Sequence, residues 1–246
     1  HLADAAFSSE RIGMEELWGE QEILSENLRR FLDSYDVILY FAGSNRENLQ
    51  KRLQSRPDLT VRVYPALPDE CAGMHCTDHY MGVLHGILPV KETPTPRLDL
   101  RQSEILEAQH YLESLGIDRR NALLMGMHVG AGNKAKRAPL QWFHHLIKSF
   151  QSLQSTVYLV PQGPADQEIV SRFVQQSGGE SIYVLNELPL RKLAAVLSLV
   201  DLFVGNDSGI THMAAAVGRP TLALFSTGNP KIWRPLGKHV RTMILT

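Results

Sequence analysis

A glycine-rich, basic segment at residues 128–137 lies between an apolar run and a helix that Pro139 introduces. Glycines let backbone N–H groups approach an anion closely, and cationic side chains such as Lys136 add charge, so the segment predicts a phosphate-binding loop. Its spacing fits neither the Walker motif nor the Gly-x-Gly-x-x-Gly dinucleotide motif, which excludes a P-loop protein and a typical dehydrogenase. A solvated basic turn is the alternative interpretation.

A second polar cluster contains Asp207, Ser208, Thr211 and His212, and it follows another apolar run. Ser208 and Gly209 leave the first-turn N–H groups of the predicted helix free to face an anionic ligand. His212 lies off the apolar stripe of that helix, toward the polar end of the sheet. A helix cap with a structural histidine is the alternative. Capping alone does not explain these four side chains together, so we favour a ligand site.

Two further loops follow predicted strands. Asp166 comes after the strand predicted at 157–160, where a carboxylate commonly accepts ribose hydroxyls in nucleotide-binding folds. It is equally consistent with a first-turn helix residue that the helix dipole favours. Leu188 comes one strand later and could lie against a base, or its loop could cap the helix that begins near Pro189.

A cluster of cysteines and histidines between residues 71 and 79 contains four side chains that can bind zinc. Its spacing matches no common zinc finger or ribbon, so we predict no metal site. The four residues are Cys71, His75, Cys76 and His79.

From Ala122 onward, predicted strands alternate with helices of about ten residues. This alternation is typical of a parallel sheet covered on both faces, in which ligands bind at the carboxyl ends of the strands. The loops described above all follow such strands. The predicted strands are 123–127, 157–160, 182–185, 202–204 and 221–225, and the predicted helices are 139–150, 166–176, 190–199 and 209–217.

The sequence of the N-terminal part indicates fewer helices and strands. Helical spacing at 17–32 is followed by an uninterrupted apolar run at 37–41, which predicts a buried strand. The segment 89–96 has three prolines and no apolar periodicity, which is typical of an interdomain linker, so we predict domains at 1–97 and 98–246. The remaining predicted elements are helices at 46–53, 80–84 and 103–116 and a strand at 61–63.

The composition narrows the class of protein. The chain has 246 residues, 43% hydrophobic and 21% charged, which excludes a disordered or fibrous protein. Its formal net charge of −1 provides no basic field for binding nucleic acid. Two cysteines indicate a reducing compartment rather than a disulfide framework. No apolar run reaches the roughly 18 residues that span a bilayer, and no signal-peptide pattern is present.

The motifs together resemble those of glycosyltransferase family 9, the ADP-heptose:lipopolysaccharide heptosyltransferases and their relatives. The resemblance runs from about Ala122 to the C-terminus. The family's His-Pro-Gly-Ser-Gly motif is matched with Val129 and Ala131 in place of Pro and Ser, and its Lys-x-Trp-Pro motif with Ala138 in place of Trp. The family's C-terminal signature is matched by residues 207–216, 218–220, 223–230 and 233–237.

The resemblance implies an α/β GT-B fold, in which two Rossmann-like domains with parallel sheets face each other across a cleft. The C-terminal domain would hold the sugar nucleotide, and the N-terminal domain would be incomplete at its start. By position, the diphosphate would be surrounded by Gly130, Ala131, Gly132 and Lys136. Asp166 would lie near the ribose, Leu188 beside the base and Asp207 at the donor sugar. The phosphates would also be bound by Ser208, Gly209 and Thr211, with support from His212.

The implied activity is an inverting, metal-independent transfer of a sugar, heptose being expected, from ADP-heptose to a lipopolysaccharide-type acceptor. Lys136, Asp207 and His212 are the candidate catalytic residues. The family's general base follows the first N-terminal strand, and no segment here matches it, so we expect it upstream of His1. The resemblance also implies no cofactor, no nucleic-acid partner, and a cytoplasmic location with at most peripheral contact at the inner membrane. A non-catalytic nucleotide-sugar-binding module is the alternative.

Overall fold

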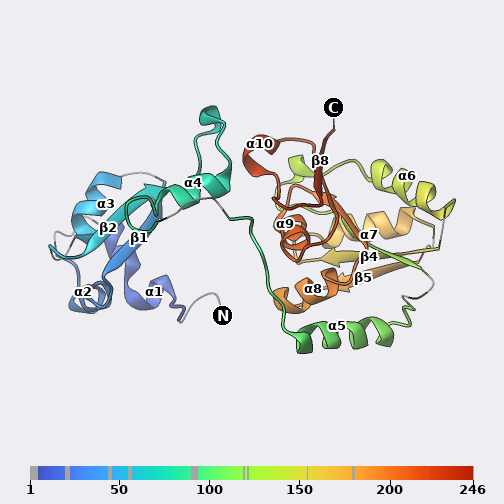
Figure 1. The fold of residues 1–246 in the computed structure, drawn as a ribbon, viewed down its shortest axis with the longest axis horizontal. Helices are drawn as coiled ribbons and strands as arrows, with labels where there is room; N and C mark the ends of the chain where they lie inside the picture. The colour runs from blue at the N-terminus through green and yellow to red at the C-terminus, as the bar shows by residue number, and fades with distance from the viewer. Residues whose placement is uncertain are drawn as a thin grey trace. The chain divides into compact units, whose positions relative to one another are not determined.

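The computed structural model describes residues 5–19, 23–43, 46–54, 57–89, 94–118, 120, 122–153, 155–178 and 181–245. The chain divides into two compact units, His1–Thr93 and Pro94–Thr246 (Figure 1). The division falls four residues before the predicted domain boundary after residue 97. No described helix is both long and apolar enough to cross a membrane.

The C-terminal unit contains a six-stranded parallel sheet within its described residues. The strand order is β5-β4-β3-β6-β7-β8, so the chain first builds outward on one side of β3 and then on the other. This order is that of a Rossmann fold, and its switch point lies between β3 and β6. The strands are β3 (Leu123–His128), β4 (Thr156–Gln162), β5 (Ile182–Asn186), β6 (Leu202–Asn206), β7 (Thr221–Phe225) and β8 (Val240–Ile244).

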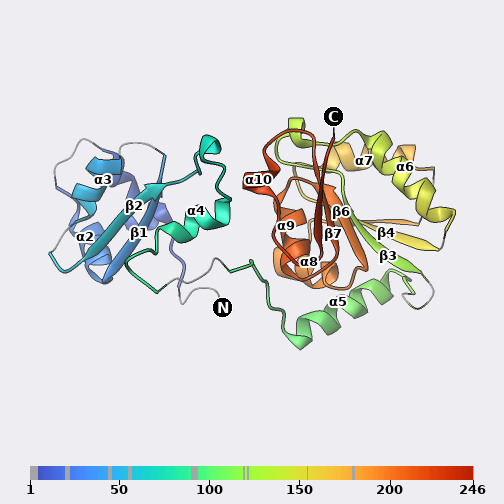
Figure 2. The ribbon, with the colours of Figure 1, turned by 45° about the horizontal axis from the view of Figure 1, so that its top comes forward.

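Helices cover both faces of this sheet, as the alternation of elements predicts. Figure 2 shows α6 and α7 on one face, and α5, α8 and α9 on the other. Alternate strand residues divide between two cores: Met125 and Val204 pack under α6 and α7, while Leu124 and Phe203 pack under the opposite helices. The helices are α5 (Gln102–Ser114), α6 (Leu140–Gln151), α7 (Gln167–Gln176), α8 (Leu190–Leu197), α9 (Gly209–Ala216) and α10 (Pro230–Trp233), with a 3-10 turn η3 (Lys134–Lys136).

Most predicted elements of this unit are present within a few residues of their predicted bounds. The strand at 221–225 is found as predicted, and α5 ends before Gly116, whose φ of +76° is the left-handed conformation expected of a terminating glycine. β8 and α10 are not among the predicted elements. β8 has four exposed residues and one half-buried residue at the sheet edge, so its sequence has no apolar run.

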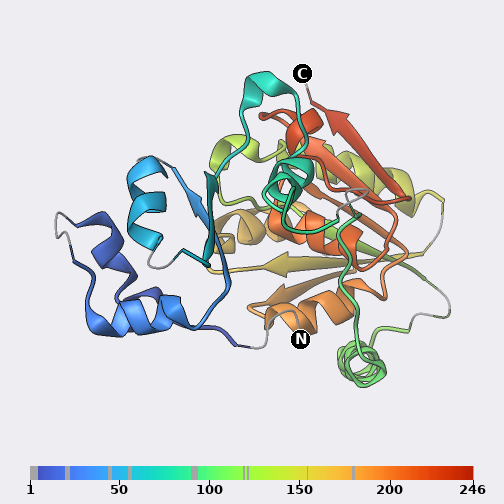
Figure 3. The same cartoon turned by 60° about the vertical axis from the view of Figure 1, so that its left-hand side comes forward.

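The N-terminal unit is smaller and has a two-stranded parallel sheet in the described residues, with α2 and α3 beside it (Figure 3). Its core is made mainly of leucines, among them Leu28, Leu32, Leu49 and Leu53. The elements are α1 (Ser9–Ile12), η1 (Met14–Trp18), α2 (Glu26–Asp33), β1 (Val37–Ala42), α3 (Arg46–Leu53), β2 (Thr60–Pro65), η2 (Glu70–Ala72) and α4 (Cys76–Gly82).

The prediction that β1 is a buried strand is wrong. Val37, Leu39 and Phe41 are 41%, 36% and 41% exposed, because they share one face of the strand and the core packs mainly against the other face. An uninterrupted apolar run indicates a strand but does not establish that both of its faces are covered. The predicted helix at 46–53 is found with those bounds as α3.

Candidate functional site

The loop from β3 to α6 is fastened to the end of β6 by a buried asparagine, Asn206. Its side-chain Nδ2 donates to the carbonyl oxygens of Val129 and Gly130, both at 3.0 Å, and its Oδ1 accepts from the N–H of Ala138 at 2.9 Å. Asn206 is fully buried. These three bonds hold both ends of the glycine-rich loop against the sheet, at the switch point where ligands bind in this fold.

Replacing Asn206 by alanine is expected to lower the free energy of unfolding by about 3 kcal/mol, because it leaves three buried backbone groups without their partner. Unfolding in urea measures the loss. Asn186 is the matched control, since its exposed side chain accepts one hydrogen bond, from Gln162. Asn186→Ala should cost under about 1 kcal/mol. Equal losses in the two variants would contradict this role of Asn206.

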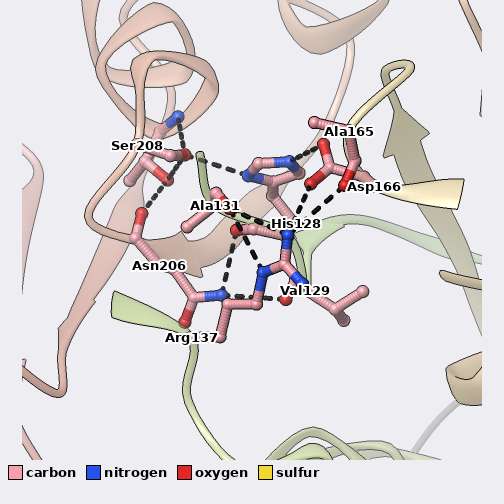
Figure 4. A network of polar contacts seen from close by, with 10 residues as sticks. His128, Val129, Ala131, Arg137, Ala165, Asp166, Asn206 and Ser208 are labelled. Carbon is pink, nitrogen blue, oxygen red and sulfur yellow. Dashed lines mark hydrogen bonds and ion pairs between the residues drawn. The ribbon is translucent and has the colours of Figure 1, made fainter. Parts of the chain in front are cut away.

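Three side chains from three segments of the chain form a hydrogen-bonded line at the same edge of the sheet. The imidazole Nδ1 of His128 lies 2.9 Å from Ser208 Oγ, and its Nε2 lies 3.2 Å from Asp166 Oδ2 (Figure 4). His128 and Asp166 are 3% and 9% exposed. The guanidinium of Arg137 donates to Ala131 O at 3.0 Å and lies 3.8 Å from Asp166 Oδ1. The carboxylate therefore sits between an imidazole and a guanidinium.

Gly130 has no side chain because the Asp166 carboxylate occupies that space. A Cβ atom at Gly130 would lie 2.1 Å from Asp166 Oδ1, far inside contact distance. Gly132 is different: nothing lies within 4 Å of a Cβ placed there, and the residue is exposed. The first glycine of the motif thus makes room for a protein side chain, whereas the second leaves open space.

The pKa of Asp166 lies below its ordinary value, chiefly because His128 bonds to the carboxylate. Burial acts in the opposite direction, while the charge of His128, the N–H of Gly163 and the charge of Arg137 lower the pKa further. The carboxylate is ionised at neutral pH. Because it only accepts, the His128 nitrogen that faces it, Nε2, carries a hydrogen whether the imidazole is neutral or protonated.

This pKa shift predicts a stability that depends on pH. A carboxyl group whose pKa is lower in the folded state stabilises the fold fully above its unfolded pKa near 3.8 and loses that contribution as the pH falls through the folded value. Wild-type protein should be more stable than Asp166→Asn by about 2 kcal/mol at pH 6. The difference should shrink below about pH 4. Urea unfolding at several pH values tests this, and a constant difference down to pH 3 would contradict it.

An ion pair joins the two sides of the switch point. Lys136 Nζ, on η3 in the β3–α6 loop, lies 2.6 Å from Asp207 Oδ2 at the end of β6. The Asp207 side chain is 6% exposed and that of Lys136 is 34% exposed. An ammonium group has three donors, so Lys136 can hold Asp207 and still present hydrogen to a ligand. Gly228, in the loop after β7, lines the same spot, since a Cβ there would lie 3.6 Å from Asp207 Oδ2.

The N-terminus of α9 lies directly after Asp207, the acidic partner of the ion pair. Gly209 is exposed at the first position of this helix, and the hydroxyl of Ser208 accepts from the N–H of Thr211 at 3.4 Å as its cap. Because the first N–H groups of a helix have no internal acceptor, this end favours an anion. The structure therefore places a lysine and a helix N-terminus beside one another.

The other predicted site residues are buried or half-buried within the protein. Thr211 is fully buried and donates its hydroxyl to Asn206 O at 2.6 Å, so this hydroxyl is used within the protein. Ala131 is also buried, and Leu188 is half-buried against the core under α5 and α8. His212 lies half-buried on α9, about one turn after Ser208.

His128, Arg137 and Asn206 belong to the site, although sequence patterns give none of them an individual role; His128 and Arg137 lie within the predicted phosphate-binding segment 128–137. His128 and Asn206 could have been recognised by their positions, because they are polar residues at the ends of two strands of the predicted sheet.

In the N-terminal unit, the imidazole of His75 caps α4, and that of His79 bonds to Pro65 O at 2.8 Å. Both histidines are thus used in local structure.

Comparison with known proteins identifies the family. The family model described as glycosyltransferase family 9 (heptosyltransferase) matches residues 55–246, more than half of the chain. The chain belongs to glycosyltransferase family 9. This confirms the resemblance that the motifs at 128–139 and 207–237 carry.

Solved structures confirm the predicted GT-B fold class. A family 9 glycosyl transferase from Veillonella parvula superposes with a TM-score of 0.70 at 22% identity, over 89% of this chain and 66% of that one. The Escherichia coli ADP-heptose lipopolysaccharide heptosyltransferase II gives 0.66 at 20% identity, over 88% and 71%. The lipooligosaccharide heptosyltransferase 2 of Campylobacter jejuni is 28% identical over 111 residues, 44% of this chain and 34% of that protein. The chain thus matches only about a third of that curated relative.

Proposed function

We propose that this chain provides the donor site of an inverting, metal-independent glycosyltransferase that moves heptose from ADP-heptose to a lipopolysaccharide-type acceptor. The observation that carries the proposal is the pairing of Lys136 with Asp207 at the N-terminus of α9. In a family 9 chain, this is the edge of the sheet where the Rossmann fold binds its ligand.

The chemistry of transfer needs positive charge at this place. When the bond from the anomeric carbon to the diphosphate breaks, its electron pair stays on the phosphate oxygen. The ammonium of Lys136 and the N–H groups that open α9 stabilise the charge that develops there, which is the role a metal ion has in other enzymes. Asp207 holds Lys136 in position and lies near the donor sugar.

The identity of the substrates rests on the relatives. One similar structure is named as an ADP-heptose lipopolysaccharide heptosyltransferase and one curated relative as a lipooligosaccharide heptosyltransferase. We accordingly propose a lipid-linked glycan as the acceptor, and a cytoplasmic location with at most peripheral contact at the inner membrane. No described residue is assigned as the general base that must deprotonate the acceptor hydroxyl.

Calorimetric titration with ADP, ADP-heptose and UDP-sugars tests the donor site. We expect ADP and ADP-heptose to bind with a Kd well below about 1 mM, in buffer containing a metal chelator, and the UDP-sugars to bind more weakly. If none binds more tightly than millimolar, the proposal is wrong. Binding of ADP-heptose without transfer to a lipopolysaccharide acceptor would favour the alternative, a non-catalytic nucleotide-sugar-binding module.

A further inference from the structure

The line of side chains Asp166, His128 and Ser208 connects a buried carboxylate to the N-terminus of α9. His128 is almost fully buried, and both of its ring nitrogens have partners within 3.2 Å (Figure 4). Ser208 stands at the outer end of the line, half-buried, as the cap of the helix at the proposed donor site. No step of the transfer chemistry derived above uses this line.

The hydrogen atoms of this line can be placed from its chemistry. The ionised Asp166 carboxylate only accepts, so Nε2 of His128 carries a hydrogen. A neutral imidazole has one N–H, so Nδ1 is then an acceptor and the hydroxyl of Ser208 donates to it. Thr211 cannot donate its hydroxyl to Ser208 because it donates to Asn206 O at 2.6 Å.

With neutral His128, the Ser208 oxygen therefore faces the end of α9 with lone pairs. This arrangement is unfavourable for an anion, because the Ser208 oxygen and an oxygen of the anion would both be hydrogen-bond acceptors. A second proton on His128 reverses it: Nδ1–H donates to Ser208 Oγ, and the Ser208 hydroxyl is released from the imidazole. In the free protein that hydroxyl has Thr211 Oγ1 as an acceptor at 3.2 Å, and a bound phosphate competes for it. A phosphate at this position would favour the protonated imidazole, both through the hydrogen bond and through charge.

We propose that His128 takes up a proton when the diphosphate of a sugar nucleotide binds at α9, and that Ser208 then donates its hydroxyl to that diphosphate. The inference rests on the proposed donor site. His128 acts through Ser208 and is a positioning residue, whereas Ser208 contacts the ligand. The affinity for the donor is then set partly by pH.

The charged groups around His128 determine how strongly the proton is held. Asp166 favours the imidazolium directly. Arg137 and Lys136 oppose it, but each has a carboxylate close by: Arg137 lies 3.8 Å from Asp166 Oδ1 and Lys136 lies 2.6 Å from Asp207 Oδ2. A diphosphate bound at Lys136 and the N-terminus of α9 adds negative charge on the Ser208 side of His128, which shifts the balance toward proton uptake.

Calorimetry in two buffers of different ionisation enthalpy measures the number of protons taken up. ADP-heptose is the probe, because its phosphates are diesters that stay ionised near neutral pH and so contribute no protons themselves. At pH 7.5 we expect binding to be accompanied by uptake of a proton, at most one for each donor molecule bound. Proton uptake couples affinity to pH, so the Kd should rise with pH by at most about tenfold per unit while His128 is neutral in the free protein and protonated in the complex, and should level off at higher pH.

His128→Gln is the decisive variant, since an amide can bond to both neighbours but does not titrate. We expect it to bind ADP-heptose with no proton uptake and no pH dependence. Ser208→Ala, at a more exposed position, should also lose the uptake because Nδ1–H then has no acceptor, while Ser208→Thr should keep it. Ser208→Ala carries the test if His128→Gln does not fold.

The outcomes separate this inference from the proposed function. Wild-type protein that fails to bind ADP-heptose would refute the donor site itself. Wild-type protein that binds without proton uptake would refute only the role of His128. Uptake that persists unchanged in His128→Gln, or in Ser208→Ala where the first variant is unfolded, would likewise overturn the inference.

Discussion

Replacing Lys136 by methionine is expected to reduce the rate of heptose transfer, kcat, by about 100-fold or more, because the variant loses a charge that stabilises the departing diphosphate. The side chain of Lys136 is one-third exposed and lies 2.6 Å from Asp207, so methionine fits in its place without creating a cavity. Steady-state kinetics with ADP-heptose and an acceptor measure the effect. KM should change much less than kcat if the interaction strengthens in the transition state.

Lys148→Met is the control for this prediction. Lys148 is exposed in the last turn of α6, at the opposite end of that helix from the candidate site, and its replacement removes the same unit of charge. Its kcat should stay within about twofold of wild type, since a surface substitution this far away acts weakly. A folded Lys136→Met protein with unchanged kcat would contradict the role assigned to Lys136.

Replacing Gly130 by alanine is expected to have the second large effect. The new Cβ would lie 2.1 Å from Asp166 Oδ1 and 2.3 Å from its Cγ, and the Asp166 carboxylate is held by His128 on its other side. One of these groups must move. We expect a loss of about 1–3 kcal/mol in the free energy of unfolding, as in other overpacked sites. Donor binding should weaken at least tenfold, because the displaced carboxylate no longer orients His128.

Gly132→Ala is the matched control in the same loop. Nothing lies within 4 Å of a Cβ at this position, so the stability should change by less than about 0.5 kcal/mol. Urea unfolding and calorimetry with ADP-heptose measure both variants. If Gly130→Ala is as stable as Gly132→Ala and binds the donor normally, Asp166 does not have the fixed position that the structure gives it.

The sheet of the C-terminal unit could be predicted from sequence because its buried strands and amphipathic helices leave clear apolar patterns. The exposed strand β8 leaves none, and it was missed. In the N-terminal unit, β1 was expected to be buried, yet Leu39 and Phe41 are exposed on one face, since an apolar run does not report which faces are covered.

The site was predictable in its location but not in its contacts. The motifs identify both Lys136 and Asp207 as site residues, but their ion pair joins segments far apart in the chain and follows only from the strand order. The central role of Asn206 was missed because a buried asparagine is recognised by its three partners and not by its own position in the sequence. Thr211, expected to face phosphate, instead uses its hydroxyl within the protein.

A crystal structure of the chain with ADP tests most directly whether a sugar nucleotide binds between Lys136 and the N-terminus of α9. We predict a β-phosphate oxygen within about 3.5 Å of Lys136 Nζ and another within the same distance of the backbone N–H of Gly209. ADP bound elsewhere, with Lys136 still in contact only with Asp207, would contradict this location of the donor site.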